Sequence, residues 1–148
     1  MKETVRDERT GWRDLTLSRR HRAWGVDCPA NDIDLLVEVA RGIPVAIIEY
    51  KRANANLEDS YQSIRSTEIL ADRARVAFFV VRYERRREKW FFRIERANAI
   101  GSAFLHSESS RVPLSLPEIE YVRLLYRLRR RDDRAVLALP AFQNEPLI

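Results

Sequence analysis

The chain holds very little cysteine and histidine. Among its 148 residues there are one cysteine, Cys28, and two histidines. An intramolecular disulfide is therefore excluded, as is a zinc site built from several cysteines. With two histidines, there are few candidates for a Ser-His-Asp catalytic triad. The sequence also lacks the phosphate loop G-x-x-x-x-G-K-[ST], the zinc motif H-E-x-x-H and the nucleophile motif G-x-S-x-G. Any chemistry must therefore come mainly from carboxylates and basic side chains.

Long hydrophobic runs are missing as well. No stretch approaches the roughly 18 apolar residues of a membrane span, and Met1-Lys2-Glu3-Thr4 lacks the apolar core of a signal peptide. We therefore expect a cytoplasmic protein in a reducing compartment, with no membrane partner. A hydrophobic content of 45% with 33% charged residues is normal for a soluble globular chain. We predict a single α/β domain over residues 1–148, which is enough chain for a real core.

Lysine is rare although the chain is basic. Only Lys2, Lys51 and Lys89 occur among 27 Lys and Arg residues, and the net charge is +5 with a pI near 9.8. Basic charge carried by arginine favours a polyanionic partner, because guanidinium binds phosphate through two N–H groups. The alternative is that the arginines only reflect a bias of genomic composition. A compact ammonium at residue 51 indicates a role for a point charge.

Two apolar runs carry the most informative pattern. Residues 32–39 and 44–51 are rich in leucine and β-branched residues and are bounded by Asn, Gly and Pro, which predicts two strands. The short break at residues 40–43 predicts a hairpin. Ala46-Ile47-Ile48 is too apolar for an exposed strand, which weighs against the plain alternative of a solvated Glu/Lys pair on a sheet edge.

The register of this hairpin brings charged side chains together. If Val39 faces Pro44, then Asp34 faces Glu49. Lys51 lies two residues after Glu49 and shares its face of the sheet, whereas a slip of one residue would send Asp34 to the other face. Buried carboxylates need partners. Two carboxylates beside an ammonium predict a hard divalent cation next to a phosphate.

Asp34 followed by Glu49-Tyr50-Lys51 resembles the motif of the PD-(D/E)xK nuclease superfamily, which includes many type II restriction enzymes and archaeal Holliday-junction resolvases. The resemblance covers roughly residues 12–81. It implies a restriction-endonuclease-like αβββαβ core with a central mixed sheet flanked by helices. It also implies a homodimer by analogy with small nucleases of this class.

The resemblance assigns roles to these residues. Asp34 and Glu49 would bind Mg²⁺, with Mn²⁺ as a substitute, and the Tyr50 carbonyl would be a third ligand. Lys51 would position or activate the attacking water. The Pro-Asp pair of the family is absent, because two residues separate Pro29 from Asp32. Asp32 therefore remains the alternative to Asp34, which the register favours.

The segment before the hairpin is dense in charge. Residues 3–24 predict one or two short helices broken near Gly11, and residues 24–27 predict a short strand or turn. In the resembled family a first helix sometimes adds an acid to the metal site, and a solvated helix face is the alternative for each candidate. The candidates are Asp7, Glu8 and Asp14. His21 is a candidate general base, although a surface histidine is the plainer interpretation.

A helix is predicted over residues 57–73, followed by a central strand over 76–81. The apolar side of the helix would consist of Leu57, Tyr61, Ile64, Ile69 and Leu70. In the resembled family this helix often carries a Gln or basic residue directed at the site or the DNA. Gln62 is therefore a further candidate catalytic residue, with an ordinary exposed glutamine as the alternative.

The remainder of the chain predicts a strand over residues 89–96 that pairs back with the central strand, then a loop with a short helical turn over 97–113. Trp90, Phe91 and Phe92 are assigned to the core because three adjacent aromatics seldom all face water. The last helix is expected to begin at Ser115 or Leu116. Its basic end, Arg127 with residues 129–131, predicts a docking helix or a phosphate clamp. Residues 135–148 are expected to pack loosely or to contact a partner.

The predicted function is hydrolysis of DNA phosphodiester bonds by a Mg²⁺-dependent endonuclease, acting on double-stranded or branched DNA and leaving a 5′-phosphate. The residues predicted to bind nucleic acid are Arg19, Arg20, Arg22, Arg52, Arg65, Arg85, Arg86 and Arg87. A non-catalytic nucleic-acid-binding or assembly protein on the same fold is the first alternative. An α/β interaction domain without any nucleic-acid partner is the second.

Overall fold

The computed structural model describes residues 7–8, 11–12, 20, 23 and 33–143. The chain divides into two compact units, residues 1–32 and 33–148. In the first unit, β1 (Asp7–Glu8) pairs antiparallel with β2 (Gly11–Trp12). The helix predicted around these residues is therefore wrong there, because so dense a run of charge offers no continuous apolar face to a helix. The strand or turn predicted at 24–27 lies outside the described residues.

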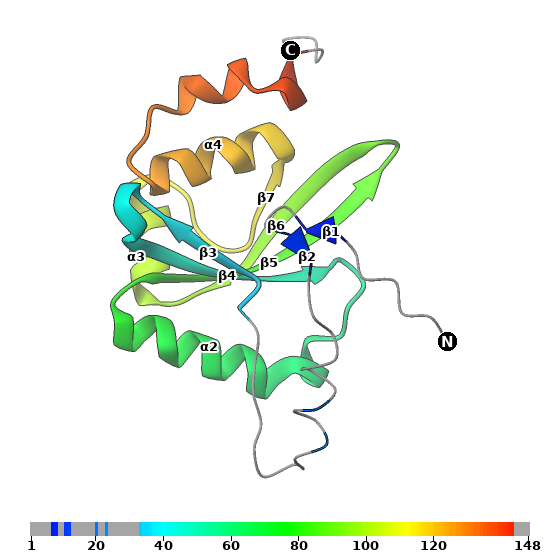
Figure 1. Cartoon of the computed structure of the whole chain (residues 1–148), viewed down its shortest axis with the longest axis vertical. Helices are drawn as coiled ribbons and strands as arrows, with labels where there is room; N and C mark the ends of the chain where they lie inside the picture. Colours follow the sequence, from blue (N-terminus) through cyan, green and yellow to red (C-terminus); the bar gives the residue numbers. More distant parts are fainter. Residues whose placement is uncertain (1–6, 9–10, 13–19, 21–22, 24–32, 144–148) are drawn as a thin grey trace. The chain divides into compact units, whose positions relative to one another are not determined.

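The second unit contains one mixed sheet of five strands (Figure 1). Their order in the sheet is the order of the chain: β3 (Leu35–Glu38), β4 (Pro44–Arg52), β5 (Ala77–Arg86), β6 (Lys89–Ala97) and β7 (Leu114–Pro117). The pair β4–β5 is parallel and the other three pairs are antiparallel. Helix α2 (Tyr61–Ala74) connects the parallel pair. The α/β class is confirmed, as is the predicted succession of two strands, a helix and a central strand parallel to its neighbour.

The hairpin register follows the prediction except at its bend. Leu36 faces Ile47, and Val37 faces Ala46, as expected from sequence. Pro44, however, lies opposite Glu38 and not Val39, because the ladder shifts by one residue after Val37. The bend is a 3₁₀ turn, η1 (Ala40–Gly42), with positive φ angles of 69° at Arg41 and 72° at Gly42. The irregularity is confined to the bend, so the pairing nearer the candidate site is unaffected.

The sheet has two covered faces (Figure 1). On the face that we call the α2 face, Ile47, Phe78 and Val80 pack against Ile64 and Ala71 of the helix. The other face, here called the α4 face, packs against α3 (Ala99–Ser107) and α4 (Glu118–Leu128). Its buried sheet residues are Val37, Ala46, Ile48, Ala77, Phe79, Val81 and Ile94. This double cover explains why β4 and β5 read as continuous apolar runs.

Helix α2 buries a different stripe from the predicted one. A 3₁₀ turn, η2 (Leu57–Ser60), precedes the helix. The buried side consists of Ile64, Thr67, Glu68 and Ala71, whereas Tyr61 and Leu70 are exposed. Two polar side chains thus occupy positions that an apolar stripe would not reveal, and both have partners on the sheet.

The C-terminal third differs most from expectation. Helix α3 occupies a stretch predicted as a loop with only a short helical turn, and β7 occupies the predicted start of the last helix. In β7, Leu114 and Leu116 are half-buried, whereas Ser115 and Pro117 are exposed. This alternation has the two-residue period of a strand. Helix α4 begins only at Glu118, with Pro117 as its N-cap.

The tail packs more firmly than expected. Two 3₁₀ turns, η3 (Asp133–Ala138) and η4 (Pro140–Phe142), follow α4. Val136 is fully buried and Phe142 is nearly so. The prediction of loose packing is wrong for residues 135–143. Within the described part of the chain, no helix combines the length and the apolar character that crossing a membrane requires.

Asn98 joins α2, β5 and α3. Its side-chain oxygen accepts hydrogen bonds from the backbone N–H groups of Phe78 at 2.9 Å and Gly101 at 2.8 Å. Its amide donates to the Val76 carbonyl at 3.0 Å and to Asp72 Oδ1 at 2.8 Å. The residue is buried, so every polar atom of this side chain is satisfied inside the protein.

Replacing Asn98 by alanine is expected to lower the free energy of unfolding by about 3 kcal/mol, because it leaves buried backbone groups unpaired at about 1–3 kcal/mol each. Urea denaturation measures the change. The exposed Asn54→Ala serves as the matched control and should change stability by less than about 0.5 kcal/mol. A loss below about 1 kcal/mol for Asn98→Ala would show that water replaces the amide at this junction.

Candidate active site

Asp34 lies one residue before β3, beside the edge of β4. Its Oδ2 accepts a hydrogen bond of 2.8 Å from the backbone N–H of Tyr50. That N–H lies beyond the end of the short strand β3, so the carboxylate takes the place of a ladder partner. The bond holds Asp34 against the strand that carries the other candidate residues.

Glu49 lies on β4 and points to the α2 face of the sheet. It is only 3% exposed, and its Oε1 lies 3.2 Å from the hydroxyl of Thr67 on α2. The same hydroxyl lies 2.9 Å from the carbonyl of Ser63. A hydroxyl has one hydrogen to donate. If Ser63 takes that hydrogen, Glu49 is best satisfied either as the protonated acid, which donates to Thr67, or with a cation beside it.

The pKa of Glu49 reflects this environment. Burial raises the pKa of its carboxyl above the usual 4.5, and the negative charge of Asp34 raises it further. The Thr67 hydroxyl and the charge of Lys51 lower the pKa, with smaller effects. The carboxyls of Asp34 and Glu49 are close enough to hydrogen-bond when one of them is protonated. The pairing of β3 with β4 and this interaction both bring the two side chains toward each other, and their role as metal ligands stays a prediction.

Lys51 follows two residues after Glu49 on β4 and is half-buried. Its charge acts on the Glu49 carboxyl, which places the ammonium near the pair of acids. In the sheet Lys51 pairs with Arg82 of β5, which pairs with Arg93 of β6. Paired residues point to the same face. A row of three cations therefore crosses the α2 face next to the row that holds the carboxylates.

Arg82 anchors the chain just beyond the candidate lysine. Its Nε donates to Glu95 Oε2 at 2.7 Å. Its terminal nitrogen donates to the carbonyls of Arg52 and Ala53, both at 3.2 Å, and of Ala55 at 2.7 Å. Four contacts from one guanidinium fix the path of the chain as it leaves β4.

Tyr50 contributes to the site only through its backbone. The two polar groups of a strand residue point to the same neighbour, so its carbonyl points toward the side on which its N–H meets Asp34. The side chain lies on the α4 face, where its hydroxyl is 2.6 Å from that of Tyr121. Edge-on ring contacts with Tyr83, Phe92 and Tyr121 surround it. Burial raises the pKa of both hydrogen-bonded phenols.

The donor set fits a magnesium ion of the kind that keeps most of its waters. Mg²⁺ in phosphate chemistry is commonly held by one or two carboxylates together with substrate phosphate. Asp34 and Glu49 supply the carboxylates, and the Tyr50 carbonyl lies on the same side. Among the described residues, no group of three or more His, Cys, Asp or Glu side chains is placed to hold a metal ion. Asp32 and Asp14 lie outside the described residues, and Asp7 and Glu8 belong to the first unit.

The remaining candidates on α2 differ in their surroundings. Gln62 lies exposed in the first turn of the helix, and its catalytic role stays a prediction. Arg65 forms an ion pair of 3.1 Å with the buried Glu68, which also pairs with Arg96 of β6 at 2.9 Å. Sequence reasoning missed Thr67, the residue of α2 that touches Glu49. Its spacing of four residues from Ser63 on the buried side of the helix is the only signal that could have found it.

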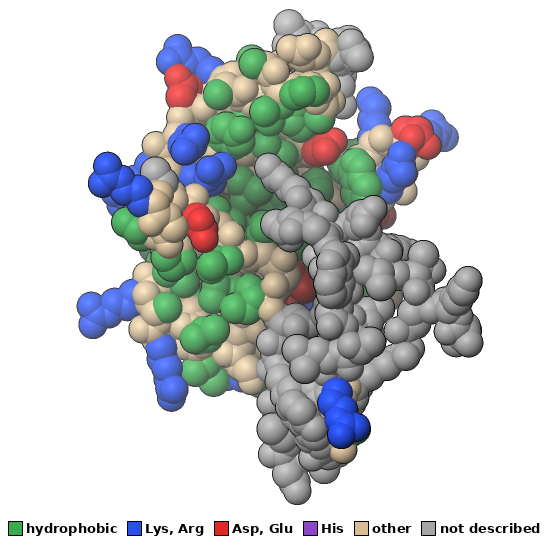
Figure 2. All heavy atoms as spheres, viewed as in Figure 1, with side chains coloured by type: hydrophobic (Ala, Val, Ile, Leu, Met, Phe, Trp, Pro, Cys, Tyr) green, Lys and Arg blue, Asp and Glu red, His purple; other side chains and the backbone are tan. Residues whose placement is uncertain are grey.

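Several predicted nucleic-acid-binding arginines gather at the β5–β6 hairpin (Figure 2). Arg85 pairs with Glu88 at 2.5 Å and lies over the ring of Trp90. Arg86 pairs with Glu84 at 3.0 Å and lies over the ring of Phe91. Both aromatic rings are half-buried beneath a guanidinium, and of the three predicted core aromatics only Phe92 stacks within the core, on Tyr121.

The other predicted arginines have varied positions. Arg52 and Arg87 are exposed at the ends of their strands, and Arg20 is exposed in the first unit. Arg19, Arg22 and His21 lie outside the described residues. At the basic end of α4, Arg127 pairs with Glu108 at 2.7 Å and Asp133 at 2.9 Å, and Arg129 donates to the Glu38 carbonyl. The phosphate clamp predicted there is thus weakened, because two of its four arginines have partners within the chain.

Comparisons of the chain with protein-family models, with curated proteins and with solved structures found no match. The arrangement of Asp34, Glu49 and Lys51 must therefore be judged on its own geometry and chemistry.

Proposed function

We propose that the protein is a Mg²⁺-dependent endonuclease of the PD-(D/E)xK type that hydrolyses phosphodiester bonds in DNA. The observation that carries this proposal is the proximity of three charged groups at the β3–β4 pair: Asp34 is bonded to the Tyr50 N–H, and the charges of Asp34 and Lys51 both act on the Glu49 carboxyl. A buried acid such as Glu49 is seldom placed beside a second carboxylate without a cation, since burial and repulsion both disfavour its charged form. A bound cation would offset both costs, which is why we interpret this pair of carboxyls as a cation site.

The residues have distinct roles in this proposal. Asp34 and Glu49 hold the ion, with the Tyr50 carbonyl as a further ligand. A bound Mg²⁺ would supply Lewis-acid stabilisation of the phosphate and a water of lowered pKa. Thr67 orients Glu49 from α2, and the Tyr50 N–H orients Asp34. The ammonium of Lys51 stabilises the negative charge that develops on the phosphate during attack.

The surroundings of the site favour a nucleic acid over a small phosphate ester. The exposed Arg93 adds a cation to that of Lys51 on this face of the sheet, whereas Arg82 between them is paired with Glu95. The net charge is +5, and cationic surface accounts for most non-specific affinity for DNA. We propose double-stranded or branched DNA as the substrate, acted on in the cytoplasm by a homodimer that cuts both strands.

The test is cleavage of plasmid, linear and branched DNA by the purified protein. Cleavage is expected with Mg²⁺ or Mn²⁺, with 5′-phosphate ends, and none is expected in excess EDTA. Filter binding at two salt concentrations is measured in parallel, and affinity should fall steeply with salt. Binding without any metal-dependent cleavage would replace this proposal by the non-catalytic binding protein. An absence of both binding and cleavage would favour an interaction domain without nucleic acid.

A further inference from the structure

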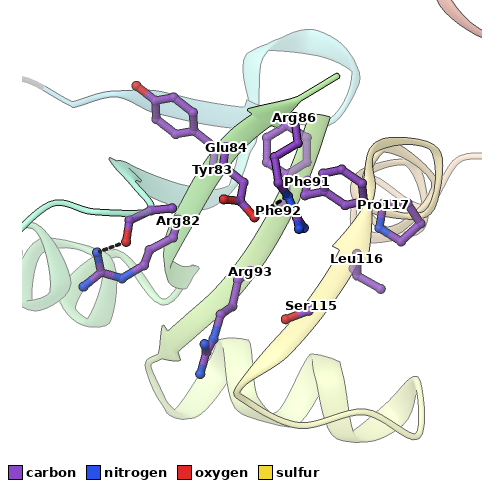
Figure 3. A pocket seen from close by; sticks show the side chains of 11 residues that line it. Arg82, Tyr83, Glu84, Arg86, Phe91, Phe92, Arg93, Ser115, Leu116 and Pro117 are labelled. Carbon is purple, nitrogen blue, oxygen red and sulfur yellow. Dashed lines mark hydrogen bonds and ion pairs between the residues drawn. The ribbon is translucent and has the colours of Figure 1, made fainter. Parts of the chain in front are cut away.

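A hollow of about 320 Å³ lies where β5, β6 and β7 meet on the sheet (Figure 3). Phe91 and Arg86 lie at one end, and Arg93 and Ser115 lie at the other (Figure 3). Ladder pairing places Phe91 with Glu84, and Arg93 with both Arg82 and Ser115. The side chains of Glu84, Phe91, Arg93 and Ser115 therefore belong to the α2 face of the sheet, the face of the candidate active site.

The hollow lies on the same face of the sheet as the active site and within reach of it. From Glu49, the position of Phe91 is two strands across and four residues along the sheet. With strands about 4.8 Å apart and about 3.3 Å per residue, the two positions are roughly 16 Å apart. Lys51 and Arg93 lie along the intervening path. A nucleic-acid strand with its scissile phosphate at Glu49 can span this distance within a few nucleotides.

The chemistry of the hollow suits a nucleobase. The Phe91 ring offers a stacking surface, and the Arg86 guanidinium already lies 4.5 Å from its centroid. Arg86 is held there by an ion pair with Glu84 whose two side chains are 64% and 41% exposed, and exposed pairs of this kind are weak. Arg86 can thus give up its position to a base and turn to a phosphate. The Ser115 hydroxyl and the Glu84 carboxylate offer hydrogen bonds to a base edge.

We infer that this hollow binds one unpaired nucleobase of the substrate strand, stacked on Phe91, with Arg93 on the adjoining phosphate. The inference rests on the proposed function. A base within a duplex is stacked on both faces and cannot reach a ring in a hollow of this size, so the occupant must come from a flap, gap, loop or frayed end. Substrates with a single-stranded segment beside the cleaved bond are therefore preferred over blunt duplex.

The experiment measures fluorescence anisotropy in EDTA, which separates binding from cleavage. The full chain is titrated onto a labelled duplex that carries a single-stranded flap and onto a blunt duplex of the same sequence, at one low salt concentration. The variants are Phe91→Leu and Arg93→Gln. Tyr126→Leu is the matched control for the ring, because Tyr126 on α4 also lies under a guanidinium, that of Arg129. Arg73→Gln, at an exposed arginine at the end of α2, controls for the loss of charge.

Phe91→Leu is expected to weaken binding of the flapped duplex about tenfold and of the blunt duplex less than about twofold, since stacking on an aromatic ring acts only on unpaired bases. Arg93→Gln should weaken the flapped duplex about fivefold, and both controls should bind like the wild type. The fluorescence of 2-aminopurine in the flap should fall on binding to the wild type and not to Phe91→Leu. If Phe91→Leu fails to fold, the quenching of 2-aminopurine by wild-type protein decides the test.

Equal loss on both DNAs for Phe91→Leu, or no loss on either, overturns the inference and leaves the proposed function intact, because that function depends on Glu49 and Lys51. Wild-type protein that cleaves DNA but shows no quenching of 2-aminopurine also overturns it. A wild type that binds no nucleic acid even at low salt removes the proposed function, and this inference with it.

Discussion

Replacing Glu49 by glutamine is expected to make the metal-free protein more stable at neutral pH. Burial and the charge of Asp34 raise the pKa of Glu49, so ionising this carboxyl weakens the fold. Glutamine has the shape of the neutral acid and removes that cost. The gain should be on the order of 1 kcal/mol, a size usual for relief of an unfavourable functional group. In a chain of this length it corresponds to about 2–4 °C in Tm.

The sign of the pH dependence follows from the same raised pKa. Below the unfolded value near 4.5, Glu49 is protonated in both states, and wild type and variant should be equally stable. Between that value and the raised pKa, the folded protein binds more protons than the unfolded chain, so wild-type stability falls as the pH rises. The advantage of Glu49→Gln should therefore grow with pH and level off above the folded pKa. Thermal unfolding in EDTA across this range measures it.

Magnesium should reverse the order of stability. An ion that binds only the folded protein stabilises it by about 1.4 kcal/mol at ten times its Kd. The wild type should gain this amount, and Glu49→Gln should gain little, because the amide oxygen carries no charge. Cleavage should fall about 10³-fold or more in the variant. The exposed Glu58→Gln on η2 is the matched control and should behave as the wild type in all three measurements.

Two results would contradict this account of Glu49. One is a Glu49→Gln variant that is clearly less stable than the wild type in EDTA at neutral pH. That result would mean that the carboxylate stabilises the metal-free fold and does not weaken it. The other is a magnesium-induced rise in Tm that survives the substitution, which would place the ion elsewhere.

Replacing Lys51 by methionine should lower kcat about 10²- to 10³-fold, in the range measured for removal of one transition-state donor. Methionine keeps the length and packing of the side chain without its charge. The magnesium-induced rise in Tm should persist and can increase, since the ion then has no neighbouring ammonium to repel it. Single-turnover cleavage together with thermal unfolding separates the loss of catalysis from loss of the metal.

Lys89→Met, at an exposed lysine in the β5–β6 hairpin, controls for removal of a lysine charge. Lys51→Arg should not restore the rate, because guanidinium is a planar fork and cannot replace a compact ammonium at one point. Full activity in Lys51→Met would show that this lysine is part of the binding surface or the fold and takes no part in the reaction.

The hairpin that carries the site could be predicted because the alternation along β4 and the pairing of Asp34 with Glu49 require the same register. Alternation places Glu49 and Lys51 on one face, and a single pairing brings Asp34 to that face. The bend was less predictable: the ladder shifts by one residue after Val37, and η1 has positive φ angles at Arg41 and Gly42. Glycine favours such a conformation, but arginine gives no signal of it.

The partners of the site and the C-terminal elements could not be predicted for a different reason. Thr67 and Glu68 are polar, so a search for apolar stripes assigns them to solvent, yet each is buried against a charged partner from the sheet. Helix α3 is only nine residues long and depends on the distant contacts of Asn98. Strand β7 is four residues long, and its pairing with β6 is the evidence that defines it. Such short elements owe their stability to tertiary contacts that local sequence does not contain.

The anchorage of Asp34 has a bearing on how durable the site is. This carboxylate precedes a strand of four residues, and of the described strands only β4 pairs with it. Glu49 belongs to a strand paired on both sides. Edge segments open at a far lower free energy than the interior of a sheet. Detachment of β3 from β4 would therefore separate the two acids and inactivate the site while the rest of the fold stays intact. A bound ion, by bridging the two strands, would stabilise the pairing of β3 with β4.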